Sequence, residues 1–561
     1  MRGTETGQVR AAYALLGVLR ARGVRFLFGL PGSTEAAVLD ALREVPDIRY
    51  VLALQEGIAV AMADGYARAS GGVSVVNLHT TVGTLGGLSL LYNAWRDRVP
   101  VVVLACHKDT RILGRGGFTT LPDTTALVRP LTKWAHQTLN PEQVAEDVER
   151  AFQQALAWPR GPAYVIVPEN LLAAPVSVDP PRPAPLPFPS RPHPEAVREI
   201  VGHLSRSERA VLVVGTEVAR RGAVEHAVQL AHALELPVLW ESRRTLLEPS
   251  YPVEDPHFVG IYDPRHPAVA EAEVLLVVGA ILFVEFAPAP AQEVPPRAFL
   301  IHVHPDAGEL GRLYPPNLAV QADVGLLLRD LVEAGRLERS SLEDRRASRR
   351  RWVAELRARW EAQRAEQRRR EAGMRPLTAF QVGEVLGRVL PQEAVVVEEA
   401  VRSCWAFLAG FPVRLGGLFR TAGGSLGWGV PAALGAQMAL GDRPVVAVVG
   451  DGSLHFTPQA LWTGVQQRLP VLVVVLNNRK YLAVEVGVRE LLRTSESLPG
   501  LPGIELPGLD HATVARGYGA GGVRVEEPGT LGDVVGDAFR KAREEGRPYL
   551  VDVPIREEWG R

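Results

Sequence analysis

Short apolar runs alternate with amphipathic stretches along most of the 561 residues. This alternation is typical of βαβ crossovers, in which successive strands lie parallel in one sheet. The apolar runs predict strands at 26–29, 73–78, 99–105 and 163–167, and again at 210–214, 237–240, 274–278 and 298–303. The pattern therefore predicts an α/β fold of doubly wound parallel-sheet domains.

The chain is too long for one hydrophobic core, and its composition divides it into three domains and a linker helix. Proline is so dense in APVSVDPPRPAPLPFPSRPHP (174–194) that this segment is expected to be an extended linker. We expect an N-terminal domain at 1–175, a middle domain at 190–337, a charged linker helix at 338–374 and a C-terminal domain at 375–561.

The charged segment 338–375 is rich in Arg and Glu and carries Trp352, Leu356 and Trp360 at helical spacing. One interpretation is an arm that binds nucleic acid or a protein partner. The other is a solvated helix whose apolar edge packs on a domain. Acidic residues are interspersed throughout and no aromatic stacking platform accompanies the arginines, which favours the packed helix.

Composition and charge narrow the class of protein further. A formal net charge of -1 argues against a polyanion partner, so we expect no nucleic acid. Cys106 and Cys404 are the only cysteines, which indicates a reducing compartment, and we expect the cytoplasm. Arginines interrupt every apolar stretch of MRGTETGQVRAAYALLGVLRARG, which predicts neither signal peptide nor membrane span.

The most informative segment is VVAVVGDGSLHFTPQALWTGVQQRLPVLVVVLNN (445–478). Its first apolar strand ends at Gly450-Asp451-Gly452-Ser453, a helix is expected at 458–468, and a second strand ends at Asn477-Asn478. A crossover of this length places Asp451 and Asn478 at the carboxyl ends of neighbouring parallel strands, where open α/β sheets bind ligands. Carboxylate and amide oxygens suit a hard divalent cation carrying a diphosphate, whereas the plainer alternative is an ordinary crossover with a glycine turn.

A GDG that closes one strand and an NN that closes the next resemble the diphosphate motif of thiamine-diphosphate enzymes, whose three-domain architecture also fits the division above. The resemblance implies thiamine diphosphate and Mg²⁺ as cofactors, with the metal held by Asp451, Asn478 and the carbonyl of Lys480. The cofactor contacts implied around these ligands are Gly450, Gly452, Ser453, Tyr481, Ala483 and Val484.

The N-terminal domain resembles the part of these enzymes that contacts the pyrimidine ring of the cofactor. In IRYVLALQEGIAVAMADGYARAS (48–70) a strand ends near Leu54 and Glu56 begins a helix with small residues on its far face. A glutamate there is also a common first-turn residue, stabilised by the helix dipole. The segment resembles the one whose glutamate contacts the pyrimidine N1′ of the cofactor. Because such enzymes build the site between two subunits, a homodimer or homotetramer is implied.

Further segments resemble the benzoylformate decarboxylase branch of the family. FLFGLPGS (26–33) implies an active-site Ser33, and VVNLHTTVGTLGG (75–87) implies an active-site His79. TAGGSLGWGVPAALGA (421–436) implies that the Gly424 carbonyl meets the aminopyrimidine and that Leu426 bends the cofactor. From the residues alone, Ser33 is equally a helix cap near Glu35, and a lone histidine such as His79 is more often structural.

The implied activity is decarboxylation of a 2-oxo acid, a small-molecule substrate, to an aldehyde and CO₂. The alternative is carboligation like that of acetolactate synthase, whose large subunits are related and usually carry FAD in the middle domain. The segment VLVVGTEVARRGA (211–223) lacks the glycine spacing of a dinucleotide fingerprint, so FAD is possible but not supported. A catalytically inactive scaffold is a further alternative, which the retained Glu56, Asp451 and Asn478 argue against.

The chain departs from the branch at several positions. VVGAILFVEFAPAP (277–290) has Phe286 where the branch has a second histidine. Residues expected around a phenyl ring align instead with Thr119, Arg420 and Gly487, and Glu485 is added beside Val484. A small pocket with Arg420 predicts a polar or carboxylate-bearing 2-oxo acid, or a carboligation outcome.

Overall fold

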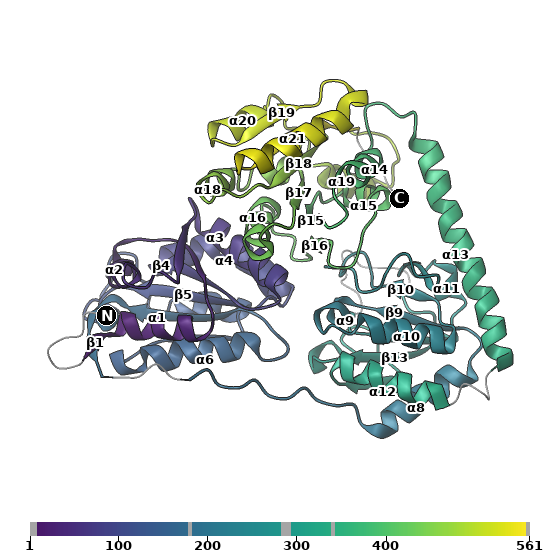
Figure 1. Ribbon diagram of the computed structural model, residues 1–561, viewed down its shortest axis with the longest axis horizontal. Helices are drawn as coiled ribbons and strands as arrows, with labels where there is room; N and C mark the ends of the chain where they lie inside the picture. The colour runs from purple at the N-terminus through teal and green to yellow at the C-terminus, as the bar shows by residue number, and fades with distance from the viewer. Residues whose placement is uncertain (1–7, 178–181, 282–292, 338–342, 557–561) are drawn as a thin grey trace. The chain divides into compact units, whose positions relative to one another are not determined.

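The structure is a computed structural model that describes residues 8–177, 182–281, 293–337 and 343–556 (Figure 1). Its chain divides into two compact units. The first comprises Met1–Leu186, Arg375–Phe411 and Gly423–Arg561, and the second comprises Pro187–Met374 and Pro412–Ala422. Three six-stranded sheets organise these units, which confirms the predicted α/β class with three parallel-sheet domains. Phe286 lies outside the described residues.

The N-terminal sheet has the strand order β3-β2-β4-β5-β7-β6, and every neighbouring pair is parallel. All five strands predicted in this domain form, the one expected to end near Leu54 being β3. The sequence pattern missed only the short β6 and the two-residue pair β1 and β8. The strands are β2 Phe26–Leu30, β3 Arg49–Leu52, β4 Ser74–His79, β5 Val101–His107, β6 Trp134–Gln137 and β7 Ala163–Pro168, with helices α1 Ala11–Ala21, α2 Ala36–Leu42, α3 Glu56–Ser70, α4 Thr80–Arg96, α5 Thr125–Val128, α6 Val144–Leu156 and α7 Glu169–Ala173.

The first residues of the predicted linker at 174–194 belong to the N-terminal domain. They form β8 (Pro175–Val176), which pairs antiparallel with β1 (Val9–Arg10). The Val176 side chain is buried in the N-terminal core, because a valine beside prolines still gains from leaving water.

The C-terminal sheet has the order β16-β15-β17-β18-β20-β19. Its central strands β17 (Val445–Gly450) and β18 (Leu472–Asn477) are parallel neighbours, with Gly450 opposite Leu476. This register confirms the predicted crossover and brings the residues after both strands to one edge. The remaining elements are β15 Val395–Glu399, β16 Leu418–Arg420, β19 Gly521–Arg524, β20 Tyr549–Pro554, α14 Ala379–Val389, α15 Cys404–Gly410, α16 Gly429–Leu440, α17 Asp451–Leu454, α18 Ala460–Gln466, α19 Leu482–Leu492, α20 His511–Gly517 and α21 Leu531–Glu545.

The middle domain is built on a sheet of order β11-β10-β9-β12-β13-β14, again parallel throughout. Its central strands β9 and β12 are apolar and buried throughout, as is typical of a parallel sheet covered on both faces. The elements are β9 Ala210–Val214, β10 Val238–Trp240, β11 Phe258–Ile261, β12 Val274–Val278, β13 Phe299–His304, β14 Leu318–Gln321, α8 Pro194–Arg206, α9 Thr216–Arg220, α10 Val224–Leu234, α11 Pro267–Ala270 and α12 Val324–Leu337.

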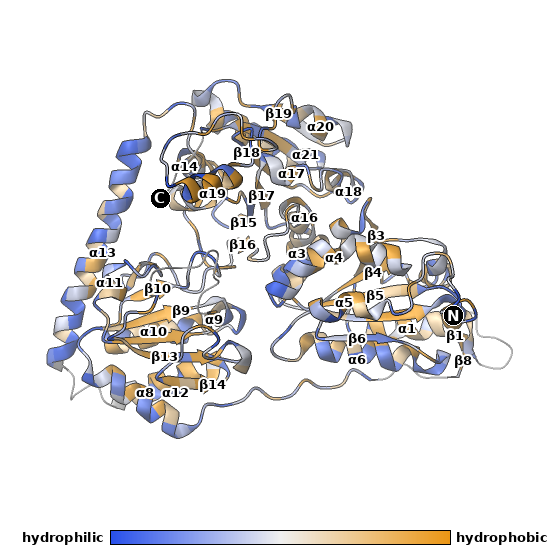
Figure 2. Cartoon of the chain, turned by 180° about the vertical axis from the view of Figure 1, so that it is seen from behind, coloured by the Kyte–Doolittle hydropathy of each residue, from blue (hydrophilic) through white to orange (hydrophobic). Residues whose placement is uncertain are grey.

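The charged segment forms the long helix α13 (Glu343–Glu371), which is mostly hydrophilic in Figure 2. Trp352 and Leu356 are buried in the middle-domain core, and the Trp360 ring meets the edge of Phe258. The predicted packing of the apolar edge is therefore confirmed. In the described ranges, no helix is both long and apolar enough to cross a membrane.

Helices α3 and α16 cross closely and join the N-terminal and C-terminal domains within the first unit. A Cβ on Gly65 would stand 2.0 Å from the carbonyl oxygen of Ala432, and one on Gly435 would stand 1.9 Å from that of Met62. The small residues expected on the helix of Glu56 thus serve backbone-to-backbone packing, which fixes the axis of α3 and with it the place of Glu56.

Candidate active site

Asp451 directly follows β17 and is 3 % exposed. Its Oδ2 accepts a hydrogen bond from the backbone N–H of Arg479 across 2.7 Å, so the ends of β17 and β18 are tied together. Burial raises the pKa of Asp451, an effect that the N–H groups of Gly452 and Arg479 partly oppose. A buried carboxylate of this kind is costly unless a cation approaches it.

The two asparagines after β18 face different ways. Asn477 is buried, and its Nδ2 donates to Asp552 Oδ1 at 2.9 Å, so this side chain belongs to the interior. Asn478 is only half-buried, and its Oδ1 accepts from the backbone N–H of Lys480 at 3.1 Å. Arg479, which follows both asparagines, has φ 62, in the left-handed region. Asn478 is therefore the amide that stays at the edge of the sheet beside Asp451.

The residues at this edge fit a magnesium diphosphate. In the described part of the chain, no Lys, Arg or His forms an ion pair with Asp451, so its charge is left for a cation. A carboxylate, an amide oxygen and a backbone carbonyl are the oxygen ligands that Mg²⁺ prefers. Gly452 allows the Tyr481 ring to pack directly on the backbone beside Asp451, since a Cβ on Gly452 would stand 2.4 Å from that ring.

Glu56 is the first residue of α3 and lies against α4. A Cβ on Gly86 would stand 2.7 Å from its Oε2, and one on Gly83 would stand 3.4 Å from its Oε1, so the glycines of α4 make room for the carboxylate. The neighbouring Gln55 accepts from the Ile58 N–H and donates to the Gly86 carbonyl, which fixes the start of α3. Glu56 is thus held half-buried with no hydrogen-bond partner among the described residues.

His79 is the last residue of β4 and is oriented by two residues that follow β2. Its Nδ1 lies 2.9 Å from Glu35 Oε2 and 2.9 Å from Thr34 Oγ1. With its proton on Nδ1, the ring donates to the Glu35 carboxylate and keeps the Nε2 lone pair for another partner. The His79 side chain remains 21 % exposed, so this edge of the ring has access to solvent or a substrate.

Glu35 is a candidate site residue that the sequence analysis noted only as a neighbour of Ser33. It is fully buried, and burial raises its pKa, while bonds from the Gly32 N–H and His79 oppose that rise. Its Oε1 has no hydrogen-bond partner among the described atoms. The S-T-E order after a glycine was an available signal, because a glutamate at this place reaches back to a backbone N–H.

Ser33 begins a short 3-10 turn and is exposed, with Lys108 Nζ donating to its Oγ at 3.4 Å. Lys108 follows β5, the neighbour of β4, so it reaches the same sheet edge. The glycine before Ser33 touches the histidine, since a Cβ on Gly32 would stand 2.2 Å from His79 Nδ1. Ser33, His79 and Lys108 thus gather at the carboxyl end of the N-terminal sheet.

The loop that carries Gly424 and Leu426 is docked on α4. Asn93 donates to the Ser425 carbonyl at 2.8 Å and accepts from its N–H at 3.0 Å. Asn93 lies seven residues after Gly86, two turns or about 10 Å along the same face of α4. One helix therefore supports both Glu56 and the loop. Gly424 has φ 81 and is exposed, and Leu426 is half-buried.

The two halves of the implied site do not touch directly. Among the described residues, no hydrogen bond or ion pair joins Ser33, Glu56 or His79 to Asp451 or Asn478. The structure brings Ser33 and His79 together and separately brings Asp451 and Asn478 together. Gly450, Gly452, Ser453 and Tyr481 surround Asp451, while Ala483 and Val484 are exposed at the start of α19.

Glu485 and Arg420, which the sequence analysis associated with the substrate pocket, both bind groups of the protein itself. Glu485 is fully buried and accepts from Lys480 Nζ at 3.2 Å and from the Leu498 N–H at 3.0 Å. Burial alone would raise its pKa, but these bonds outweigh it and lower the pKa. Arg420 donates to the Leu246 carbonyl at 2.8 Å within the second unit. Both contacts depend on tertiary packing that the local pattern does not contain.

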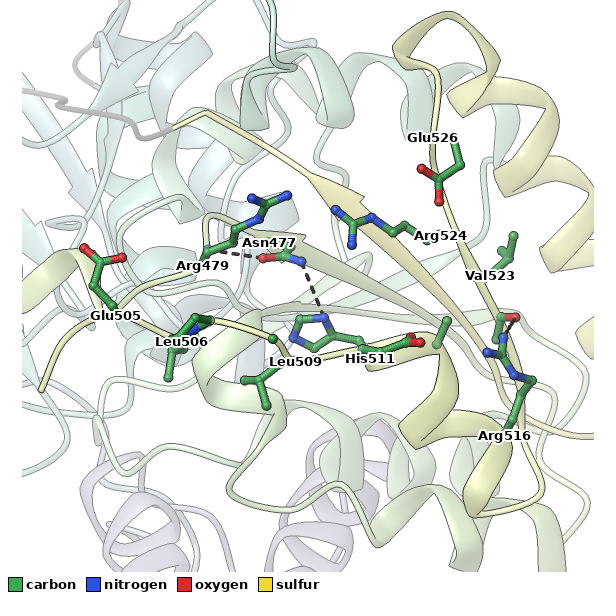
Figure 3. Close-up of a pocket in the computed structure, with 15 residues that line it drawn as sticks. Asn477, Arg479, Glu505, Leu506, Leu509, His511, Arg516, Val523, Arg524 and Glu526 are labelled. Atoms are coloured by element: carbon green, nitrogen blue, oxygen red, sulfur yellow. Dashed lines mark hydrogen bonds between the residues drawn. The ribbon is translucent and has the colours of Figure 1, made fainter.

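A cavity of about 780 Å³ opens beside the end of β18 (Figure 3). Asn477 and Arg479 line it, but Asp451 and Asn478 do not. Its charged lining is balanced, with three arginines and three acids: Arg479, Arg516, Arg524, Glu505, Asp510 and Glu526. We therefore place the implied chemistry at the sheet edge around Asp451 and not in this cavity.

Comparison with known proteins matches all three domains to one family. The descriptions are "Thiamine pyrophosphate enzyme, N-terminal TPP binding domain" at residues 9–127, the central domain of the same enzymes at 197–331, and their C-terminal TPP binding domain at 411–553. These matches confirm the resemblance that the motifs predicted.

Individual relatives span nearly the whole chain. Benzoylformate decarboxylase of Pseudomonas aeruginosa is 34 % identical over 96 % of this chain and 97 % of its own. A probable acetolactate synthase large subunit of Methanocaldococcus jannaschii is 26 % identical over 98 % of this chain and 92 % of its own. The solved thiamine diphosphate-dependent 4-hydroxybenzoylformate decarboxylase of Rhodococcus jostii RHA1 superposes with a TM-score of 0.83 at 28 % identity, covering 98 % of this chain and 100 % of its own.

Proposed function

The chain belongs to the thiamine pyrophosphate enzymes, and we propose that within this family it decarboxylates a 2-oxo acid to an aldehyde and CO₂. The observation that carries the proposal is the pairing of His79 Nδ1 with the buried Glu35 at 2.9 Å. That pairing leaves Nε2 of an accessible histidine free to bind the substrate carboxylate or carbonyl and to move a proton. The decarboxylase relative at 34 % identity supports the same choice.

Thiamine diphosphate would supply the electron sink for loss of CO₂. We propose that Mg²⁺ is held by Asp451, Asn478 and the Lys480 carbonyl, and that Glu56 hydrogen-bonds the pyrimidine N1′. The cofactor-binding set proposed with them is Gly424, Leu426, Gly450, Gly452, Ser453, Tyr481, Ala483 and Val484.

On the substrate side we propose His79 and Ser33 as catalytic groups beside Glu56. Glu35 acts through His79 as a positioning residue, because its carboxylate fixes which ring nitrogen carries the proton. Lys108, which donates to Ser33, adds a positive charge where the carboxylate of a 2-oxo acid would lie. An ammonium at that place favours binding of the acid over the uncharged aldehyde product.

We also propose that two copies of the chain complete each site, in a homodimer or homotetramer. Glu56 and Asp451 make no contact within one chain, which supports a shared site. Co-expression of Glu56→Gln with Asp451→Asn tests it, because a mixed dimer with shared sites contains one intact site. We expect the mixture to regain about a quarter of wild-type activity. Sites built within single chains would leave the mixture as inactive as either variant alone.

Cys106 and Cys404 are both buried and form no disulfide, which supports the cytoplasm as the compartment. The decisive experiment for the reaction is product analysis with thiamine diphosphate and Mg²⁺, comparing benzoylformate with pyruvate and using Glu56→Gln as the blank. Benzaldehyde from the wild type alone supports the decarboxylase. Acetolactate from pyruvate without benzaldehyde would contradict it and assign the protein to carboligation.

A further inference from the structure

Three side chains of the middle domain, none of them among the proposed active-site residues, converge on one another. They are His232 on α10 and Asp255 and His257 just before β11, and we call them the histidine–aspartate cluster. One potential ligand atom of each lies within 4.8 Å of the others. No other group of three or more His, Cys, Asp or Glu side chains converges in this way in the described ranges.

The Asp255 carboxylate stands between the two imidazoles. His232 Nε2 lies 2.8 Å from Oδ2, and His257 Nδ1 lies 3.3 Å from Oδ1. Oδ1 also accepts from the Tyr251 hydroxyl at 3.0 Å and from the His257 N–H at 2.9 Å. Asp255 is thus the central oxygen donor of the cluster.

The His257 ring is held from its other side. Its Nε2 lies 3.2 Å from Glu235 Oε2, and Arg350 and Arg346 also pair with Glu235. Glu235 thus fixes the Nε2 edge of the ring, and the Nδ1 edge faces Asp255.

That Nδ1 is the observation that points to a ligand. His257 is 6 % exposed, and its Nδ1 has no hydrogen-bond partner. It faces the Asp255 carboxylate, with 3.3 Å between Nδ1 and Oδ1. A cation bound between these two atoms would give the buried Nδ1 a partner. A carboxylate that receives the far N–H of the histidine, as Glu235 does, is also the usual support of a metal-bound imidazole.

We propose that His232, Asp255 and His257 bind a divalent transition-metal ion of the Zn²⁺ class. Two imidazole nitrogens and one carboxylate oxygen suit Zn²⁺, Co²⁺ or Ni²⁺, whereas Mg²⁺ prefers an all-oxygen set. Tetrahedral ligands at zinc bond lengths stand about 3.3 Å apart, close to the separations present. His232 is 47 % exposed on its side chain, so ion entry and a fourth ligand from solvent are open.

The site would clamp three elements of the middle domain. The segment before β11 is already held by α13, since Arg357 donates to the Val253 and Phe258 carbonyls at 2.9 Å each. The metal would add α10 through His232. Ligands held on an already fixed backbone lose little freedom on binding, which favours affinity.

Binding of Co²⁺ and Zn²⁺ tests the proposal. Chelator-treated protein in the Asp451→Asn background is titrated with Co²⁺ in the presence of excess Mg²⁺. We expect one equivalent per chain with a four-coordinate visible spectrum that Zn²⁺ abolishes, and a thermal midpoint several degrees higher with Zn²⁺. His257→Gln and the exposed His232→Gln should each weaken binding by at least about tenfold. His226→Gln, on the same helix but outside the cluster, should bind like its parent.

Two results would overturn the proposal. One is the absence of a cobalt spectrum and of a Zn²⁺-dependent thermal shift in the parent, which would make the cluster an imidazolium–carboxylate ion pair. The other is unchanged Co²⁺ affinity in His232→Gln, a variant whose exposed position spares the fold. Neither result bears on the proposed decarboxylation, because the cluster lies in the second unit and the assay needs no substrate.

Discussion

Nε1 of Trp428 donates a hydrogen bond to Oδ1 of Asp64 across 3.1 Å, and both residues are fully buried. Asp64 stands eight residues after Glu56 on α3, and Trp428 closes the loop of Gly424 and Leu426. Arg68 completes the arrangement, with its Nε 2.5 Å from Asp64 and its guanidinium 5.0 Å from the Trp428 ring centroid. The hydrogen bond therefore links α3 to the loop of Gly424 and Leu426. These are the two segments that the family resemblance implies in contact with the aminopyrimidine of the cofactor.

Trp428→Phe removes this hydrogen bond and keeps most of the ring volume. Burial raises the pKa of Asp64, so the loss of a donor leaves a buried carboxyl less satisfied. We expect the free energy of unfolding to fall by about 1–3 kcal/mol and the cofactor affinity to fall with it. Urea unfolding and cofactor titration measure both. Trp95→Phe, at an exposed ring on α4, is the matched control and should change neither.

The sequence pattern predicted which residues lie at the carboxyl ends of the strands, but not the side chains that pair with them. Asp451 and Asn478 were predictable because a strand, a helix and a strand dictate that the residues after both strands meet. Glu35 follows β2 and His79 ends the neighbouring parallel strand β4, with Leu30 opposite Leu78, yet their pairing needs that register to be known. The inward turn of Glu485 had no local signal, because it depends on Lys480 and on the chain returning at Leu498.

Glu35→Gln tests the support of His79. The amide cannot hold the Nδ1 proton as a carboxylate does, so we expect kcat to fall about 10- to 100-fold with little change in cofactor affinity. Burial raises the pKa of Glu35, so the carboxylate is lost as the pH falls through that raised pKa. The acid limb of the wild-type kcat/KM profile should therefore flatten in the variant.

Glu146→Gln, an exposed change on α6, is the control for Glu35→Gln and should keep the wild-type profile. A Glu35→Gln enzyme with a wild-type kcat and an unchanged acid limb would contradict a positioning role. A change confined to the thermal midpoint would assign Glu35 to the fold alone.

Glu241 gives the middle domain a stability that depends on pH. Burial raises its pKa from 4.5 to about 7, although hydrogen bonds from Thr216 oppose the rise. The folded protein thus keeps a proton that the unfolded chain releases above pH 4.5. The free energy of unfolding should fall as the pH rises between these two values and level off above them.

Glu241→Gln mimics the protonated acid and removes this dependence. We expect the variant to exceed the wild type by up to about 3 kcal/mol near pH 8 and to match it near pH 4. Urea unfolding at both pH values measures the difference. Glu254→Gln, at an exposed position of the same domain, should follow the wild type at both. A Glu241→Gln variant that is less stable than the wild type at the higher pH would contradict a buried, protonated Glu241.

Removal of the metal should expose the role of Asp451. With Mg²⁺ and thiamine diphosphate, the wild type should gain several degrees in thermal midpoint, because ligands that bind only the folded state stabilise it. Chelation of Mg²⁺ should abolish that gain. Asp451→Asn loses the charge that attracts the cation, so the gain should be absent even at high Mg²⁺. Asp510→Asn, an exposed acid of the same domain, should respond like the wild type.

Two glycine-to-alanine substitutions should have opposite effects, because only one of the two glycines lies where α3 and α16 cross. Gly65→Ala places a methyl group 2.0 Å from the Ala432 carbonyl oxygen, so the helices must separate. We expect a loss of about 1–3 kcal/mol in the free energy of unfolding, and weaker cofactor binding because Glu56 moves with α3. Gly536→Ala in α21 meets nothing closer than 3.6 Å and should gain about 0.5–1 kcal/mol from helix propensity. Urea unfolding of both variants decides the point: equal effects would mean that the close approach at Gly65 does not constrain the helix that presents Glu56.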